Sequence, residues 1–161
     1  MIQRYSIVRV SPFSVRRLIQ VERILYSCGK DMAEKEGLYH WDNPHFKNIL
    51  ILILCALKNR IHLIYNSSTP VATFQTRTLG DSLYFYKLAT VPSLSNKGIG
   101  TYCLDEIERQ ASVSGCKSSC CEVYNKSIHA IEFYKHRGYS VVVEKKTLKY
   151  TELILEKRIH S

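Results

Sequence analysis

The chain has 161 residues, a length that suits one domain, and hydrophobic residues make up 45% of it, as is usual for a protein with a packed core. Its longest apolar run, residues 49–57, is much shorter than the ~18 residues that a membrane helix needs. Arg4 and Arg9 interrupt the first ten residues, which argues against the apolar core of an export signal. We therefore expect residues 1–161 to form a single domain in the cytoplasm, without a membrane partner.

Charge and cysteine spacing narrow the range of partners. Lys and Arg number 23 against 14 Asp and Glu, and the formal net charge of +9 suits an anionic partner such as a phosphorylated cofactor. The basic residues are spread along the chain rather than gathered in one stripe, which disfavours a nucleic-acid partner. Cys116-x3-Cys120 lacks a second Cys/His pair at ligand spacing, and adjacent Cys120 and Cys121 would point to opposite faces of a strand. We therefore expect reduced thiols and no metal site.

The first half of the chain is predicted to contain one strand, two helices and a β-meander. Residues 5–10 are strand-like, and Ser11-Pro12 is typical of a helix start. Apolar residues at helical spacing continue to about residue 27, followed by a loop that contains Gly29. Residues 44–57 are apolar all round and indicate a buried helix, with a strand as the alternative. Patterns rich in aromatic and β-branched residues predict three strands, at residues 60–65, 70–76 and 83–90.

The second half alternates helices and strands. Residues 99–111 are amphipathic with a helical period, residues 117–124 are strand-like, and a helix over residues 128–136 is closed by Gly138. Two last strands, residues 139–144 and 148–155, are expected to pair around the turn Lys145-Lys146-Thr147. The predicted order is βααβββαβαββ, which defines an α/β chain.

A strand–loop–helix unit, residues 88–101, is the segment most informative about binding. Gly98 and Gly100 lie where the helix begins, so a ligand can approach the backbone closely there. First-turn N–H groups without intrahelical partners, together with the helix dipole, make a site suited to a pyrophosphate, and Lys97 adds a positive charge. The alternative is a plain turn in which the two glycines relieve crowding. A dinucleotide fingerprint is excluded because Cys103 occupies its third glycine position.

Two spaced segments of the chain resemble the GCN5-related N-acetyltransferases. Leu88-Ala89-Thr90, Pro92 and Ser95-x-x-Gly98-x-Gly100 match the strand end, the proline and the Gln/Arg-x-x-Gly-x-Gly/Ala helix start of that family. Residues 130–139 are similar to the family segment Ala-x-x-Phe-Tyr-x-x-x-Gly-Phe/Tyr, and the resemblance covers residues 83–155 well. Ser95 stands where the family has Gln or Arg, and Asn96 where a glycine is common.

The resemblance implies a mixed, splayed sheet flanked by helices, with acetyl-CoA as co-substrate and an amine as acceptor. The backbone of the strand end would bind the pantetheine arm, and the loop and first helical turn would cradle the pyrophosphate. Ser127 matches a position where related acetyltransferases use Asn against the cofactor, although it is also an N-cap candidate. The implied cofactor-binding residues are Leu88, Ala89, Thr90, Asn96, Lys97, Gly98, Ile99, Gly100, Thr101 and Ser127.

Two residues match the family positions for acid and base. Acetyl transfer requires a neutral amine and a proton for the departing thiolate. Tyr134 matches the acid, because a tyrosine hydroxyl, with an ordinary pKa of about 10, is a proton donor at pH 7. Glu122 matches the base. The alternatives are a packed aromatic ring for Tyr134 and an exposed strand residue for Glu122.

Three aromatic residues are candidates for lining the acceptor site. Tyr84 and Tyr86 share one face of their strand, and Trp41 lies in the loop that the family folds over its substrate; core packing is the alternative for all three. We rank a small amine ahead of a peptide N-terminus or a lysine. A rival hypothesis is a non-catalytic CoA-binding sensor or scaffold, favoured by Ser95 and Ser127. Dimers are common among proteins that resemble this one, so a homodimer is a further expectation.

Overall fold

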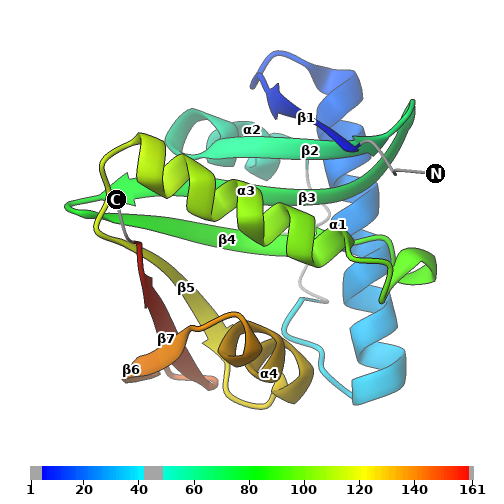
Figure 1. Ribbon diagram of the computed structural model, residues 1–161. Coiled ribbons are helices and arrows are strands. Elements are labelled where there is room, and N and C mark those ends of the chain that lie inside the picture. The colour runs from blue at the N-terminus through cyan, green and yellow to red at the C-terminus, as the bar shows by residue number, and fades with distance from the viewer. Residues whose placement is uncertain (1–4, 42–48, 160–161) are drawn as a thin grey trace. The chain divides into compact units, whose positions relative to one another are not determined.

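The computed structural model describes residues 5–41 and 49–159, and its helices and strands follow the predicted order (Figure 1). A short 3-10 turn, η2, is added between the fourth strand and the third helix. The elements are β1 (Tyr5–Val10), α1 (Val15–Glu36), α2 (Ile49–Lys58), β2 (Arg60–Asn66), β3 (Thr69–Leu79), β4 (Ser82–Thr90), η2 (Pro92–Leu94), α3 (Ile99–Val113), β5 (Ser118–Tyr124), α4 (Ile128–His136), β6 (Ser140–Lys146) and β7 (Thr151–Arg158).

The described strands form one mixed sheet in the order β1-β2-β3-β4-β5-β7-β6. β1 pairs with β2, and β2 with β3, in antiparallel ladders. β4 and β5 are parallel, whereas β7 is antiparallel to both β5 and β6. This sheet, flanked by helices, confirms the predicted α/β class. Contacts divide the chain into two compact units: Met1–Arg77 with Lys87–Asp105, and Thr78–Tyr86 with Glu106–Ser161.

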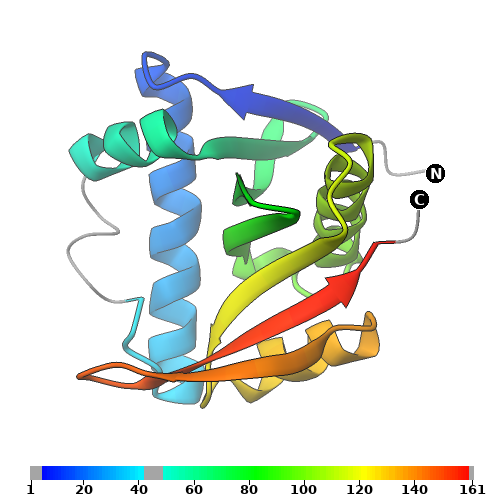
Figure 2. The ribbon, with the colours of Figure 1, turned by 90° about the vertical axis from the view of Figure 1, so that its left-hand side faces the viewer.

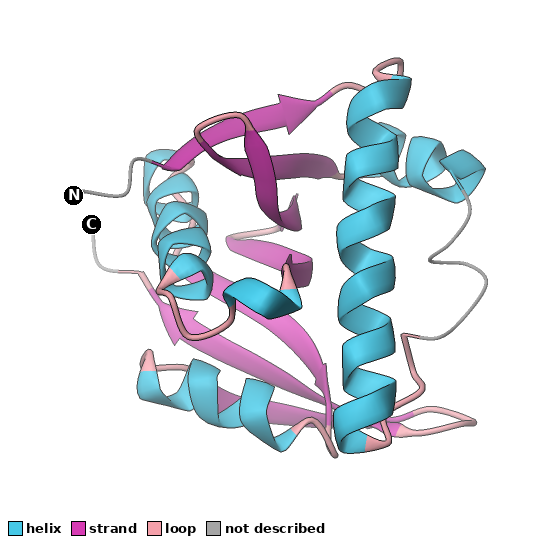
Figure 3. Ribbon diagram, turned by 90° about the vertical axis from the view of Figure 1, so that its right-hand side faces the viewer, coloured by secondary structure: helices cyan, strands magenta, loops and turns pink. Residues whose placement is uncertain are grey.

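The core of the first unit forms where the apolar stripe of α1 meets the strands. Leu18, Val21 and Leu25 recur at helical spacing on α1, and all three are buried. Leu52 of α2 joins them, and α2 contacts both α1 and β2. Figure 3 shows α2 beside the long α1 helix. The helix predicted for this apolar run is thus confirmed from Ile49 onward, and the earlier part of that prediction lies outside the described residues.

Helix α1 is longer than the sequence pattern indicated, because Gly29 lies within it rather than in a loop. A Cβ at Gly29 would lie 3.2 Å from the Trp41 carbonyl oxygen and 3.3 Å from the Trp41 Cβ. The glycine therefore permits a close approach of the following segment instead of ending the helix. The helix ends at Gly37, where φ is +65° and the amide donates to the Ala33 carbonyl at 3.2 Å.

The core of the second unit is rich in aromatic rings. Phe85 of β4 packs edge-on against Tyr134 of α4 and against Tyr139, with ring centroids 5.6 and 5.9 Å away. The Tyr139 hydroxyl donates to the Ser119 hydroxyl at 3.0 Å. Figures 2 and 3 view the molecule from opposite sides and show α4 on one face of β5, β7 and β6. The predicted bounds of α4 are confirmed, and Gly138 follows it with φ of +89°.

The last hairpin turns later than predicted. Lys145 and Lys146 belong to β6, and the turn spans Thr147 to Tyr150. The Thr147 hydroxyl donates to the Tyr150 carbonyl at 2.6 Å and accepts the Tyr150 amide at 3.1 Å, so this side chain closes the turn. The two lysines instead extend an exposed edge strand, where charged side chains are favourable.

No helix within residues 5–41 or 49–159 combines the length and hydropathy needed to cross a membrane.

The two faces of α2 should differ in their contribution to stability. Leu52 is fully buried, whereas Leu54 is 52% exposed on the same helix. We expect Leu52→Ala to lower the free energy of unfolding by about 2–5 kcal/mol, because it leaves a cavity, and Leu54→Ala by less than about 1 kcal/mol. Urea unfolding followed by circular dichroism measures both. Equal losses for the two variants would contradict the described packing of α2.

Candidate active site

The cofactor-binding candidates of the first unit follow one another along the chain from the end of β4 to the first turn of α3. Ala89 is buried in the core of this unit, so its methyl group packs inward. Leu88 and Thr90 on either side are partly exposed. A role for the backbone of these three residues in binding the pantetheine arm stays a prediction.

Lys87, immediately before them, interrupts the regular course of β4. Its φ of +52° is unusual for a residue with a side chain and costs of order 1 kcal/mol. Its ammonium lies 4.0 Å from the Cys55 sulfur on α2. A left-handed residue inside a strand redirects the backbone that follows, as in a β-bulge. Sequence reasoning missed Lys87, because no local pattern marks a lysine for this conformation.

The start of α3 has the geometry of an anion site. Asn96 and Gly98 have φ of +61° and +79°, and a Cβ on Gly98 would meet nothing within 4 Å. At the entry to α3, the Tyr102 amide donates to the Gly98 carbonyl at 3.0 Å. The amides of Ile99, Gly100 and Thr101 therefore precede the helical ladder. The first turn carries no acidic residue that would repel a phosphate.

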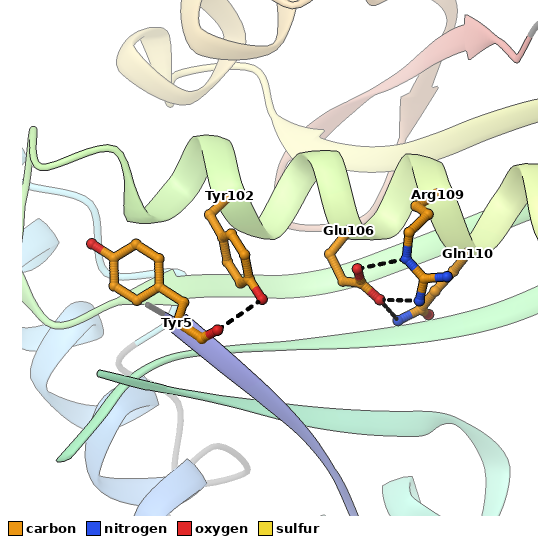
Figure 4. Close-up of polar contacts among 5 residues, drawn as sticks. All are labelled: Tyr5, Tyr102, Glu106, Arg109 and Gln110. Atoms are coloured by element: carbon orange, nitrogen blue, oxygen red, sulfur yellow. Dashed lines mark hydrogen bonds and ion pairs between the residues drawn. The ribbon is translucent and has the colours of Figure 1, made fainter. Parts of the chain in front are cut away.

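Side chains of α3 make one contact with β1 and a group of hydrogen bonds within the helix (Figure 4). The Tyr102 hydroxyl lies 3.5 Å from the Tyr5 carbonyl of β1, and the two rings are 5.0 Å apart. This contact positions the first turn of α3 within the first unit. Further along, Arg109 donates two hydrogen bonds to Glu106, at 2.8 and 2.7 Å, and Gln110 donates a third at 3.3 Å. Such pairs three and four residues apart stabilise the helix.

In the second unit, Glu122 lies at the surface of β5. Its carboxylate forms an ion pair with Lys145 of β6, with 3.5 Å between Oε1 and Nζ. Cys120 and Tyr124 share the Glu122 face of β5, because side chains alternate along a strand. No sequence pattern indicated Lys145 as a partner, because the contact depends on the register of the last hairpin.

Tyr134, the acid candidate, belongs to the buried aromatic cluster of the second unit. Only 8% of it is exposed, and its ring contacts Phe85, Phe133 and Tyr139. Phe85 is directly opposite Cys121 in the β4–β5 ladder, so Tyr134 packs on the face of β5 opposite to that of Glu122. The packed-aromatic alternative and the acid role are therefore compatible, since packing fixes the position of the hydroxyl.

Ser127 occupies the N-cap position of α4 and is buried, but its side chain makes no capping hydrogen bond. Its carbonyl accepts the Ile131 amide at 3.0 Å. The hydroxyl is thus not engaged in the local helix cap.

The three acceptor candidates fall into two groups. Tyr84 and Tyr86 lie on one face of β4 with nearly parallel rings, 6.3 Å apart and inclined by 19°. Burial, and then the neighbouring Cys120, Glu122 and Glu156, raise the pKa of Tyr84, so its hydroxyl stays protonated. Trp41 is in the first unit, where it packs against the buried core and against Gly29 of α1.

All six cysteines are free thiols, and the described residues contain no cluster of three or more His, Cys, Asp or Glu that could hold a metal ion. Burial raises the pKa of Cys103 to about 12. Burial also raises the pKa of Cys28 to about 11, nearby Asp31 adds to this, and a hydrogen bond from the Thr90 backbone opposes it. Cys28 therefore joins α1 to the end of β4 as an apolar packing group.

Comparison with known proteins identifies the family. The family model for the GNAT acetyltransferase domain matches residues 58–141, more than half of the chain. The chain belongs to this family. The matched region contains both the cofactor segment of the first unit and the residues Glu122 and Tyr134 of the second. No curated protein sequence matches the chain significantly.

Solved structures share the fold at low sequence identity. The ribosomal-protein-S18-alanine N-acetyltransferase from Escherichia coli has a TM-score of 0.72 at 12% identity, with 98% of this chain and 96% of that chain covered. The PaiA N-acetyltransferase from Thermoplasma acidophilum, in complex with coenzyme A, has a TM-score of 0.71 at 19% identity, with 96% and 99% covered. Ard1 from Thermoplasma volcanium has a TM-score of 0.74 at 13% identity, with 98% and 99% covered.

The chain is therefore an acyltransferase of the GNAT type with acetyl-CoA as its co-substrate. The residues present fit that molecule. Exposed Asn96, Lys97 and Gly98 precede a helix whose first amides point along its axis, and this combination of amides, dipole and positive charge suits a pyrophosphate.

Gly98 should be required for binding but not for folding. We expect Gly98→Val to weaken acetyl-CoA binding at least about tenfold, because a branched side chain covers the backbone that the anion approaches. Gly80, in the β3–β4 turn, is the matched control, since it also has a positive φ and a Cβ placed there would meet no atom within 4 Å. Gly80→Val imposes the same backbone strain without touching the cofactor segment. Calorimetric titration that shows equal affinities for both variants would contradict this assignment.

The buried thiol of Cys28 predicts a loss of stability in alkali. Its folded pKa of about 11 exceeds the ordinary value of 9.0, so above pH 9 the unfolded chain holds fewer protons than the folded one. The free energy of unfolding should then fall as pH rises from 9 to 11, by up to about 1 kcal/mol per pH unit from this group. Urea midpoints at pH 8, 9 and 10 measure the slope. Cys28→Ala should make that slope shallower, and an unchanged slope would refute the contribution.

Proposed function

We propose that this chain transfers an acetyl group from acetyl-CoA to a primary amine by direct attack, with Glu122 as general base and Tyr134 as general acid. The observations that support the proposal are the packing of the Tyr134 ring, which fixes the place of its hydroxyl oxygen, and the exposure of Glu122 on β5 in the same unit.

The proposed step has a simple proton balance. Acetyl-CoA supplies the acyl group as a reactive thioester. Glu122 accepts a proton from the amine nitrogen as the carbon–nitrogen bond forms. Tyr134 donates its hydroxyl proton to the sulfur as the carbon–sulfur bond breaks, so the products are an amide and the CoA thiol. Exchange with solvent then returns a proton to Tyr134 and removes one from Glu122.

Local packing supports these two roles in different ways. Tyr134 is held by Phe85, Phe133 and Tyr139, so the position of its hydroxyl oxygen is fixed. Glu122 is at the surface, where an acceptor from solvent can reach it and where a proton can leave after the reaction. Tyr84, protonated because of its raised pKa, lies on the same face as Cys120 and lines the approach to Glu122.

The acceptor is proposed to be a small primary amine, ahead of a peptide N-terminus or a lysine side chain. The stacked pair of Tyr84 and Tyr86 offers a flat apolar surface for an organic amine. The structural neighbour from Escherichia coli is named for an alanine of ribosomal protein S18. The acceptor panel should therefore include monoamines, diamines, lysine derivatives and peptides with a free N-terminal alanine.

Removal of the proposed acid or base should slow turnover without weakening cofactor binding. We expect Glu122→Gln and Tyr134→Phe each to lower kcat by about 100-fold, with the KM for acetyl-CoA changed less than about threefold. Release of the CoA thiol with the best amine measures both. Glu144→Gln on exposed β6 and Tyr150→Phe in the hairpin turn are controls, expected to retain wild-type rates. Wild-type kcat in both site variants would refute the proposed roles.

The second candidate function is a CoA-binding sensor or scaffold without turnover. Exposed Ser95 replaces a long polar side chain at the cofactor loop, and the Ser127 hydroxyl is not used as a helix cap. Micromolar acetyl-CoA binding without thiol release across the whole panel would favour this function over the enzyme.

We also propose that the protein acts in the cytoplasm and as a homodimer. Six unbridged cysteines suit a reducing compartment. Light scattering of the purified protein tests the dimer, and a mass of one chain, 18.6 kDa, would refute it.

A further inference from the structure

The surroundings of Glu122 are unusually acidic for a chain with a net charge of +9. In the β5–β7 ladder, Glu122 is opposite Ile154, and the pairs on either side bring Glu156 opposite Cys120 and Glu152 opposite Tyr124. Side chains directly opposite each other share a face, so three glutamates lie on this face of the second unit. Diagonal neighbours in such a ladder are roughly 7–8 Å apart, close enough for their charges to repel.

Lys145 brings a positive charge to this face from a third strand. It is opposite Glu152 in the β6–β7 ladder, and its side chain reaches past β7 to the Glu122 carboxylate, with 3.5 Å between Nζ and Oε1. The lysine is 51% exposed and the glutamate side chain 29% exposed. Among the described residues of β4, β5 and β7, other titratable groups on the Glu122 face include Tyr84, Tyr86, Cys120, Tyr124, Glu152 and Glu156.

We propose that Lys145 is a positioning residue, which holds the Glu122 carboxylate in one orientation for proton abstraction. The proposal rests on the role of Glu122 as base set out above. A glutamate on a strand has a fixed Cβ but several rotamers, and two like charges nearby favour those that turn its carboxylate away. The Lys145 ammonium, which comes from the far side of β7, attracts the Glu122 carboxylate and so reduces the number of rotamers that Glu122 adopts. Lys145 itself gains and loses no proton in the reaction.

The adjacent lysine provides a matched control. Lys146 follows Lys145 on β6 and is opposite Thr151, so its side chain points to the other face of the hairpin. Both lysines are exposed and lie in the same edge strand. Replacing either one therefore changes the net charge of the protein equally, whereas the ion pair with Glu122 belongs to Lys145.

The effect of losing Lys145 should be moderate, because an ion pair at this exposure contributes little free energy. We expect Lys145→Met to lower kcat roughly three- to fivefold, with the KM for acetyl-CoA unchanged. Lys145→Arg should restore at least half of the wild-type rate, since it keeps the charge and the reach. Lys146→Met should behave as wild type. The thermal midpoint of each variant shows whether any loss comes from unfolding instead.

A double-mutant cycle separates this inference from the proposed function. If Lys145 acts through Glu122, Lys145→Met should have no further effect on the residual rate of Glu122→Gln. A folded Lys145→Met variant with wild-type kcat, alongside an impaired Glu122→Gln, would overturn the positioning role and leave the base intact. An equal loss in both backgrounds would also overturn it, because Lys145 would then act independently. A wild-type rate in Glu122→Gln would instead refute the base itself.

Discussion

Parallel pairing between β4 and β5 lasts for four residue pairs, from Ser82–Ser118 to Phe85–Cys121, and it sets which side chains of β4 and β5 share a face in the second unit. The residues proposed to act follow it on both strands. On β4, Lys87 comes two residues after Phe85. Its backbone has a left-handed conformation, which redirects the chain that leads to Ala89. On β5, Glu122 is the next residue, and it remains paired with β7. This local pairing therefore sets the position of the proposed base within the second unit.

The two proposed proton-transfer groups are held by different physical means. Tyr134 is fixed by dense aromatic packing, which costs little at a neutral hydroxyl and gives a rigid donor. Glu122 is charged, so burial would be expensive, and an ion pair at the surface orients it instead. The second unit thus holds the proposed acid in a rigid cluster and the proposed base at an accessible surface. Each group is supported by the kind of contact that suits its charge.

Sequence patterns predicted the order of elements well and their ends less well. β1 and α4 have the predicted bounds, because strong periodicity and a closing Gly138 define them. The predicted end of α1 was wrong because a glycine is often a helix breaker. Gly29 lies within the helix instead, and its lack of a side chain lets Trp41 approach closely. The predicted position of the last turn was wrong because two adjacent lysines suit a turn as well as an edge strand, and here they belong to β6. That error also concealed the ion pair, since Lys145 reaches Glu122 only when it belongs to β6. The cofactor segment could be proposed from the sequence because Gly98 and its neighbours determine the local backbone geometry, whereas cross-strand contacts depend on register.

The contact between Gly29 and Trp41 has a consequence for protein engineering. Any side chain introduced at residue 29 would require Trp41 to shift by a few tenths of an ångström, because a Cβ there would lie 3.2 Å from the Trp41 carbonyl oxygen. A library that randomises residue 29 would lose this close contact, and a segment grafted after α1 would then lack its packing against the helix. A practical design would therefore keep Gly29 and Trp41 unchanged.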